Sequence, residues 1–189
     1  MPNMTGSTLI LVAVVVVIAA LAIALAWSSR LRRRRVELQE RFGPEYDRTV
    51  QALGTTGRAD AALEERASRV AKYRIRELNG DESRRFRSEW NRIQATFVDD
   101  PSAAVTEADA LVTEAMTARG YPMADWDRRV EDLTVDHANV VHHYRAARDI
   151  AARHERHEAS TEELRQALVH YRELFADLLG PVDTGRRTA

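Results

Sequence analysis

The sequence predicts an all-α protein in which one N-terminal transmembrane helix is followed by a compact bundle of about six helices. Three observations predict this fold. Residues 8–27 form an apolar run without a single charge. Behind that run, apolar side chains recur at intervals of three and four residues, the period of a helix with one buried face. No stretch of useful length alternates apolar and polar residues as a half-buried strand does.

The apolar run reads TLILVAVVVVIAALAIALAW and ends at Trp27. Twenty helical residues cover roughly 30 Å, the thickness of the hydrocarbon core of a bilayer. In lipid a single segment satisfies its backbone only as a helix, and tryptophan favours the membrane–water interface. We therefore expect a transmembrane helix over residues 8–27, after a short N-terminal tail at residues 1–7.

Five arginines follow the apolar run, and we call them the arginine collar. They are Arg30, Arg32, Arg33, Arg34 and Arg35. Positive charge marks the cytoplasmic flank of a membrane helix. We therefore expect a single-pass plasma-membrane protein with its N-terminus outside and its C-terminal domain in the cytoplasm. The collar is also the predicted membrane-surface site, because each basic group near anionic lipid is worth on the order of 1 kcal/mol.

Charge is divided unevenly along the chain. Residues 30–42 hold six arginines and two glutamates, a net charge of +4, whereas residues 43–179 hold 20 basic and 26 acidic side chains, a net charge of −6. Because an acidic domain repels phosphate backbones, no nucleic-acid partner is expected. The absence of cysteine excludes disulfides and thiolate chemistry, and no serine-nucleophile, P-loop or dinucleotide motif occurs. We expect a non-enzymatic protein with no cofactor.

Turn and capping residues divide the rest of the chain into helical segments. Residues 28–42, which include the collar, continue the membrane helix until Gly43-Pro44 interrupts it. The first expected helices of the domain cover residues 45–53 and 58–78, and a third is capped by Asp81 and carries Phe86 to Phe97. A fourth covers residues 101–119 behind the cap Asp100, and a short fifth runs from Trp126 to Leu133. A sixth is capped by Asp136 and carries Val140 to Ala151, and the last begins behind a capping box at Ser160 and reaches Leu178. The helical domain thus covers residues 43–179, and residues 180–189 are expected to be a disordered tail.

Aromatic and small residues each have a simple structural interpretation. The aromatic side chains recur at the spacing of a helical core and are interpreted as packing residues: Trp90, Trp126, Tyr144, Tyr171 and Phe175. Within the span, Ala20 and Ala24 lie four residues apart, as do Ala22 and Ala26, which permits the close approach of a second helix. A homodimer through the membrane helix therefore remains open.

All six histidines fall between residues 137 and 170. His154 and His157 lie three residues apart, whereas the metalloprotease motif HExxH requires a spacing of four to present both rings to one zinc ion. Charged neighbours favour an exposed helix end at this pair, so no metal ligand is assigned. A metal- or pH-responsive sensor that uses this histidine-rich region stays an alternative.

Several stretches together resemble an uncharacterised family of actinobacterial proteins that are described only as hypothetical, membrane or secreted. These stretches are RFGPEYDRTV (41–50), RFRSEWNRIQATFVDDP (85–101), RGYPMADW (119–126), LTVDHANVVHHYRAA (133–147) and ERHEASTEELRQALVHYRELFADLL (155–179). The resemblance covers roughly residues 30–179. It implies a location and a source, and it brings no activity, cofactor or catalytic residue.

The sequence thus favours a membrane-anchored helical interaction or scaffold protein whose process and protein partner are unknown. One alternative is an exported or surface-facing helical protein. Ala24-Leu25-Ala26 resembles a signal-peptide cleavage site, although the segment MPNMTGS before the apolar run lacks the positive charge with which a signal peptide begins.

Overall fold

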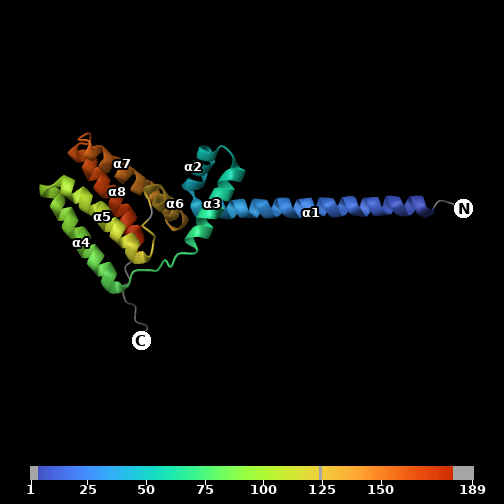
Figure 1. Ribbon diagram of the computed structural model, residues 1–189, viewed down its shortest axis with the longest axis horizontal. Helices are drawn as coiled ribbons and strands as arrows, with labels where there is room; N and C mark the ends of the chain where they lie inside the picture. Colours follow the sequence, from blue (N-terminus) through green and yellow to red (C-terminus); the bar gives the residue numbers. More distant parts are fainter. Residues whose placement is uncertain (1–3, 124, 181–189) are drawn as a thin grey trace, which may run out of the picture. The chain divides into compact units, whose positions relative to one another are not determined.

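The computed structural model describes residues 4–123 and 125–180, which form eight α-helices and no strand (Figure 1). The predicted all-α fold class is therefore confirmed. Contacts within the chain divide it into two compact units, Met1–Glu40 and Arg41–Ala189. The first unit holds nearly all of the N-terminal helix, and the second is the helical domain.

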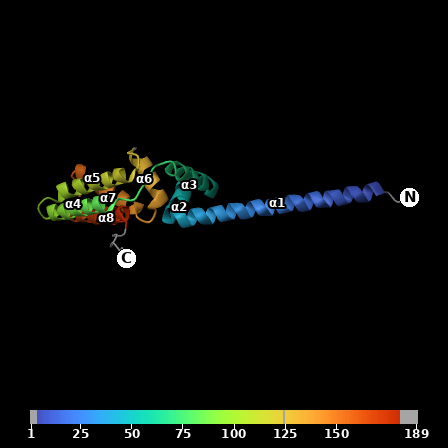
Figure 2. The ribbon, with the colours of Figure 1, turned by 90° about the horizontal axis from the view of Figure 1, so that it is seen from below.

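Helix α1 (Met4–Phe42) runs without interruption through the apolar run and the arginine collar (Figure 2). Its segment Val12–Phe42 is long and apolar enough to cross a membrane: the most apolar 18-residue window of this segment has a mean hydropathy of 2.5, and none of that window is buried. The hydroxyls of Ser28 and Ser29 donate to backbone carbonyls one turn earlier, at 3.0 and 2.9 Å. The prediction that residues 28–42 continue the apolar helix is confirmed.

Seven helices form the domain in the described part of the chain, one for each helical segment expected from the sequence. They are α2 (Pro44–Leu53), α3 (Thr56–Val70), α4 (Gly80–Asp99), α5 (Pro101–Arg119), α6 (Trp126–Asp136), α7 (Val141–Glu155) and α8 (Thr161–Leu179). Helices α4, α5, α8 and α7 pack against one another in that order (Figure 1). These four helices are called the four-helix group. Helix α3 packs against α2 and α6, and α6 packs against α7, so α6 connects α2 and α3 to the four-helix group.

Aromatic side chains fill the centre of the four-helix group, as predicted. Trp90 on α4 stacks on Phe175 of α8 with ring centroids 4.9 Å apart, and Tyr144 on α7 meets Tyr171 of α8 edge to face at 6.3 Å. The Tyr171 hydroxyl donates to Asp109 at 3.0 Å. Burial, together with the charge of Asp109, raises the pKa of Tyr171, so its phenol stays protonated and donates steadily within the core.

Two of the predicted helix starts are confirmed in detail. Ser160 and Glu163 form a capping box at α8, in which each side chain accepts from the other residue's backbone N–H. At α5, Asp100 accepts from the backbone N–H of Ala103, and Pro101 occupies the first turn. The predicted helix ends at Gly120 and Gly180 are also confirmed.

Two other predicted caps are wrong. The cap of α4 is Asn79, which lies two residues before the predicted cap Asp81. Asn79 forms a capping box with Glu82, so the helix begins at Gly80. Asp136 is the last residue of α6 and does not cap the next helix. Helix α6 extends that far because Val135 is buried in the domain, and α7 begins at residue 141 without a side-chain cap.

The long helix expected over residues 58–78 ends at Val70 instead. The following segment leaves the helical conformation because its polar and apolar groups find partners elsewhere in the domain. The Tyr73 hydroxyl donates to Asp132 at 2.9 Å, and the Arg76 backbone N–H donates to the carbonyl of Arg119 at 2.9 Å. Leu78 packs against the core. Of the tail expected at residues 180–189, all but Gly180 lie outside the described residues.

The close passage of this segment past the end of α5 requires glycine at position 120. Gly120 has a φ of +94°, and a Cβ there would lie 2.5 Å from the carbonyl oxygen of Arg74.

We expect Gly120→Ala to lower the free energy of unfolding by more than twice as much as Gly54→Ala, measured by chemical denaturation followed by circular dichroism. Gly54 is the matched control, because its φ is +76° but no atom lies within 4 Å of the added Cβ, so only the left-handed backbone cost of about 1–2 kcal/mol applies. Equal losses would contradict the close approach.

Candidate functional site

The arginine collar lies on α1 directly after its most apolar residues. Arg30, Arg32, Arg33 and Arg34 are exposed, and Arg35 is half-buried. Successive helical residues are turned by roughly 100° about the helix axis. The four consecutive arginines at positions 32–35 therefore distribute positive charge around almost the whole helix. A ring of guanidinium groups beside an apolar segment can contact lipid phosphates in any rotation of the helix about its axis.

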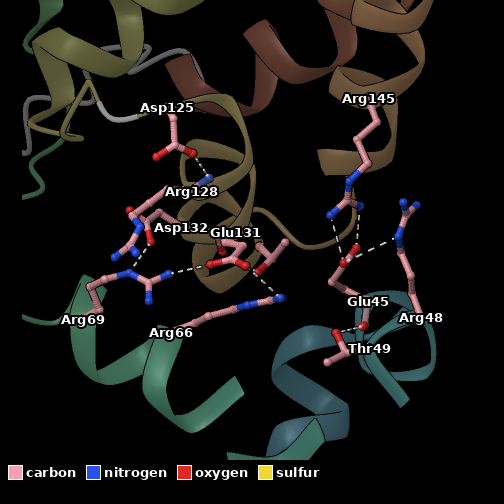
Figure 3. A network of polar contacts seen from close by, with 11 residues as sticks. Glu45, Arg48, Thr49, Arg66, Arg69, Asp125, Arg128, Glu131, Asp132 and Arg145 are labelled. Atoms are coloured by element: carbon pink, nitrogen blue, oxygen red, sulfur yellow. Dashed lines mark hydrogen bonds and ion pairs between the residues drawn. The ribbon is translucent and has the colours of Figure 1, made fainter. Parts of the chain in front are cut away.

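A second candidate site lies within the helical domain, where α2, α3, α6 and α7 surround a groove of about 990 Å³. Charged side chains dominate its lining. They are Arg48, Arg66, Arg69, Arg128, Arg145 and Arg148, with Glu45, Glu65, Asp127, Glu131 and Asp149. We call this feature the charged groove, and Figure 3 shows how its central side chains pair.

One wall of the charged groove is a buried ion pair between α2 and α7. Glu45 is only 6% exposed, and its two carboxylate oxygens accept from the two Nη atoms of Arg145 at 2.6 and 2.9 Å (Figure 3). Arg48 approaches the same carboxylate at 4.0 Å. This two-pronged geometry is the strongest form of arginine–carboxylate contact, and it fixes α2 to a helix 100 residues later in the chain.

The other wall is a network between α3 and α6. Arg69 donates to Asp132 at 2.9 Å and to Glu131 at 3.0 Å, while Arg66 donates to Glu131 at 3.4 Å (Figure 3). Asp132 is buried and also accepts from Tyr73. Burial and the hydrogen bond to Asp132 raise the pKa of the Tyr73 hydroxyl, so it remains a donor at neutral pH. The charges at the base of the groove therefore neutralise one another.

The rim of the charged groove keeps exposed charge. Arg48 is 62% exposed on α2, and Arg128 is exposed at the start of α6. Glu65 and Asp127 are exposed beside them. Of the lining residues, Thr49 carries the only hydroxyl, which donates to the carbonyl of Glu45 at 2.8 Å. Paired charges at the base and exposed charges of both signs at the rim suit contact with a polar surface.

A smaller cavity of about 790 Å³ lies where α4 begins and α8 ends. His137, which is 7% exposed, forms its polar wall: Nδ1 pairs with Asp177, and Nε2 lies 3.2 Å from Nη1 of Arg119. Because arginine can only donate, Nε2 is the acceptor and Nδ1 carries the proton that faces Asp177. Arg119 also donates to the carbonyl of Leu178 at 3.1 Å. Both nitrogens of His137 thus serve to join helix ends.

The two histidines considered as a metal pair lie on different elements. His154 lies in α7, where its Nε2 is 2.6 Å from the Ser102 hydroxyl. His157 lies beyond the end of that helix, at a φ of +61°. No group of three or more histidine, aspartate or glutamate side chains in residues 4–123 and 125–180 is arranged to hold a metal ion. The remaining histidines, His142, His143 and His170, lie on α7 and α8.

No protein-family model matches the chain, and no curated protein and no solved structure is significantly similar to it. The resemblance to the actinobacterial family therefore stays a prediction.

The ion pair of Glu45 and Arg145 gives the most direct test of the charged groove. We expect Glu45→Gln to lower the free energy of unfolding by about 3 kcal/mol, because it leaves a largely buried guanidinium without its counter-ion. The double variant Glu45→Met, Arg145→Met is expected to recover most of that loss, and Arg48→Gln to change stability by less than about 0.5 kcal/mol. Chemical denaturation measures all three, and equal effects at Glu45 and Arg48 would contradict the assignment.

Proposed function

We propose that the chain is a non-enzymatic, membrane-anchored interaction or scaffold protein of the plasma membrane. In this proposal α1 crosses the bilayer once with its N-terminus outside, and the helical domain lies in the cytoplasm. The single observation that supports it most is the complete exposure of the apolar window of α1, which no part of the described chain covers.

That exposure has a large energetic consequence. Each buried Val, Leu or Ile side chain is worth about 1.5–3 kcal/mol relative to one left in water, and α1 exposes such side chains one after another from Val12 to Leu31. A soluble protein rarely exposes an apolar surface of this size. Lipid is the environment that removes the whole circumference of the helix from water at once.

The orientation is supported by the arginine collar. A cluster of arginines holds the end of the helix that carries it on the cytoplasmic side, and the anionic lipids of that leaflet attract the same groups. The net charge of −6 on residues 43–179 has the opposite effect, because it repels the bulk of the domain from an anionic surface. We infer that the collar contacts lipid while the domain stays available to partners.

The charged groove supports an interaction function more than a catalytic one. Its buried groups already pair with one another, so they are occupied in holding helices together. Its rim presents Arg48 and Arg128 beside Glu65 and Asp127, a pattern suited to a complementary polar surface on another protein. Confinement to the membrane raises the effective concentration of such a partner if the partner is also at the membrane.

The proposed topology is tested with reporters at the C-terminus. We expect a C-terminal green fluorescent protein fusion to be fluorescent and a C-terminal alkaline phosphatase fusion to be inactive, because the first folds in the cytoplasm and the second outside it. A variant with all five collar arginines replaced by glutamine is the matched control, and it is expected to gain phosphatase activity. An active phosphatase on the unchanged chain would instead support the exported or surface-facing alternative.

The proposed interaction surface is tested by photo-crosslinking in intact cells. We expect p-benzoylphenylalanine in place of Arg128, on the rim of the charged groove, to yield a discrete crosslinked species. The same residue in place of Gln94, an exposed position on α4 outside the groove, is the control and is expected to yield none. Identical patterns at the two positions would contradict the groove as the contact surface.

A further inference from the structure

Three imidazole rings gather on the outer side of the α7–α8 pair. His142 and His143 are neighbours on α7, and His170 lies on α8. The ring centroids of His142 and His143 are 3.9 Å apart, and those of His143 and His170 are 5.1 Å apart. His142 is exposed, and the other two rings are half-buried. None of the three lines the charged groove or belongs to the core.

The two half-buried rings face each other through the same kind of nitrogen. Nδ1 of His143 lies 2.9 Å from Nδ1 of His170. Without a bound ion this contact requires one nitrogen to donate a proton and the other to accept it. When each ring carries its proton on Nε2, both Nδ1 atoms hold a lone pair and can bind one metal ion, because neutral imidazole nitrogen is the commonest metal ligand in proteins.

The separation of the two nitrogens is short enough for both to bind one ion. Metal–imidazole bonds are about 2.0–2.1 Å long, so two nitrogens at a right angle about one ion are about 2.9 Å apart, as in a square-planar or octahedral centre. A tetrahedral centre with the same bond length places them about 3.3 Å apart. The two nitrogens, already 2.9 Å apart, can therefore both reach one ion of tetragonal geometry, which is typical of Cu(II) or Ni(II), with little movement of either helix.

One carboxylate lies close to the two rings. Glu173 is on α8 three residues after His170, one turn further along the helix, and its charge acts on His143. The same carboxylate offsets part of the charge of a bound divalent cation.

We propose that Nδ1 of His143 and Nδ1 of His170 bind one divalent transition-metal ion of tetragonal preference, Cu(II) or Ni(II), between α7 and α8. The protein supplies two ligands and water completes the coordination, so the ion is exchangeable. Binding joins two helices whose ligands are 27 residues apart in the chain and thereby stabilises their packing. The site is independent of the membrane anchor and of the charged groove.

The test uses the full-length chain in detergent micelles, purified without a histidine tag. We expect one equivalent of Cu(II) or Ni(II) to bind in isothermal titration calorimetry and to raise the unfolding temperature. His143→Gln and His170→Gln are each expected to weaken binding at least about tenfold, since loss of a second-shell partner alone costs that much. The double variant His154→Gln, His157→Gln removes two imidazoles, one more than either single variant, and is expected to bind like the unchanged chain.

A spectroscopic measurement separates this site from scattered surface binding. The electron paramagnetic resonance spectrum of the Cu(II) complex is expected to show a tetragonal centre with two imidazole nitrogen donors, and one of these donors is expected to be lost in His170→Gln. Circular dichroism of the metal-free variants checks that each still folds. The proposal is overturned if the unchanged chain binds neither ion, or if the His154, His157 double variant loses binding as strongly as His170→Gln.

Discussion

The removal of one apolar helix from water is the constraint on which the rest of this account depends. From Val12 to Leu31 every side chain of α1 is exposed, and no charge interrupts the apolar run. Such a surface is stable in lipid, and the hydroxyls of Ser28 and Ser29 satisfy themselves on the helix backbone. The arginine collar follows at the point where a membrane helix meets water, so the apolar surface and the charge indicate the same boundary.

The helical domain has a hydrophobic core of its own. Stacked aromatic rings, such as Trp90 on Phe175, occupy the centre of the four-helix group. The remaining helices are held by directional ion pairs, with Glu45 joining α2 to α7 and Asp132 joining α6 to α3. Buried ion pairs add little net stability, because desolvation offsets their attraction. Their fixed geometry instead determines how α2 and α3 are placed against α6 and α7.

Local signals were sufficient to predict most helices, whereas contacts distant in sequence were not predictable. The capping box at Ser160 is complete within four residues, so the sequence identifies it. The end of α3 at Val70 depends instead on Tyr73 reaching Asp132, 59 residues later, and no local pattern marks that contact. The pairing of Glu45 with Arg145 and the approach of His143 to His170 have the same origin: composition shows the charged and imidazole groups, but only the packed helices bring them together.

We infer above all that α1 stays in the protein and lies in the membrane. The most direct test is to wash the membrane fraction of the native host with alkaline carbonate and to measure the intact mass of the protein that remains. We expect the protein to be retained in the membrane with residues 8–27 still part of its mass. A soluble form that begins near Trp27, recovered from the culture medium, would contradict it.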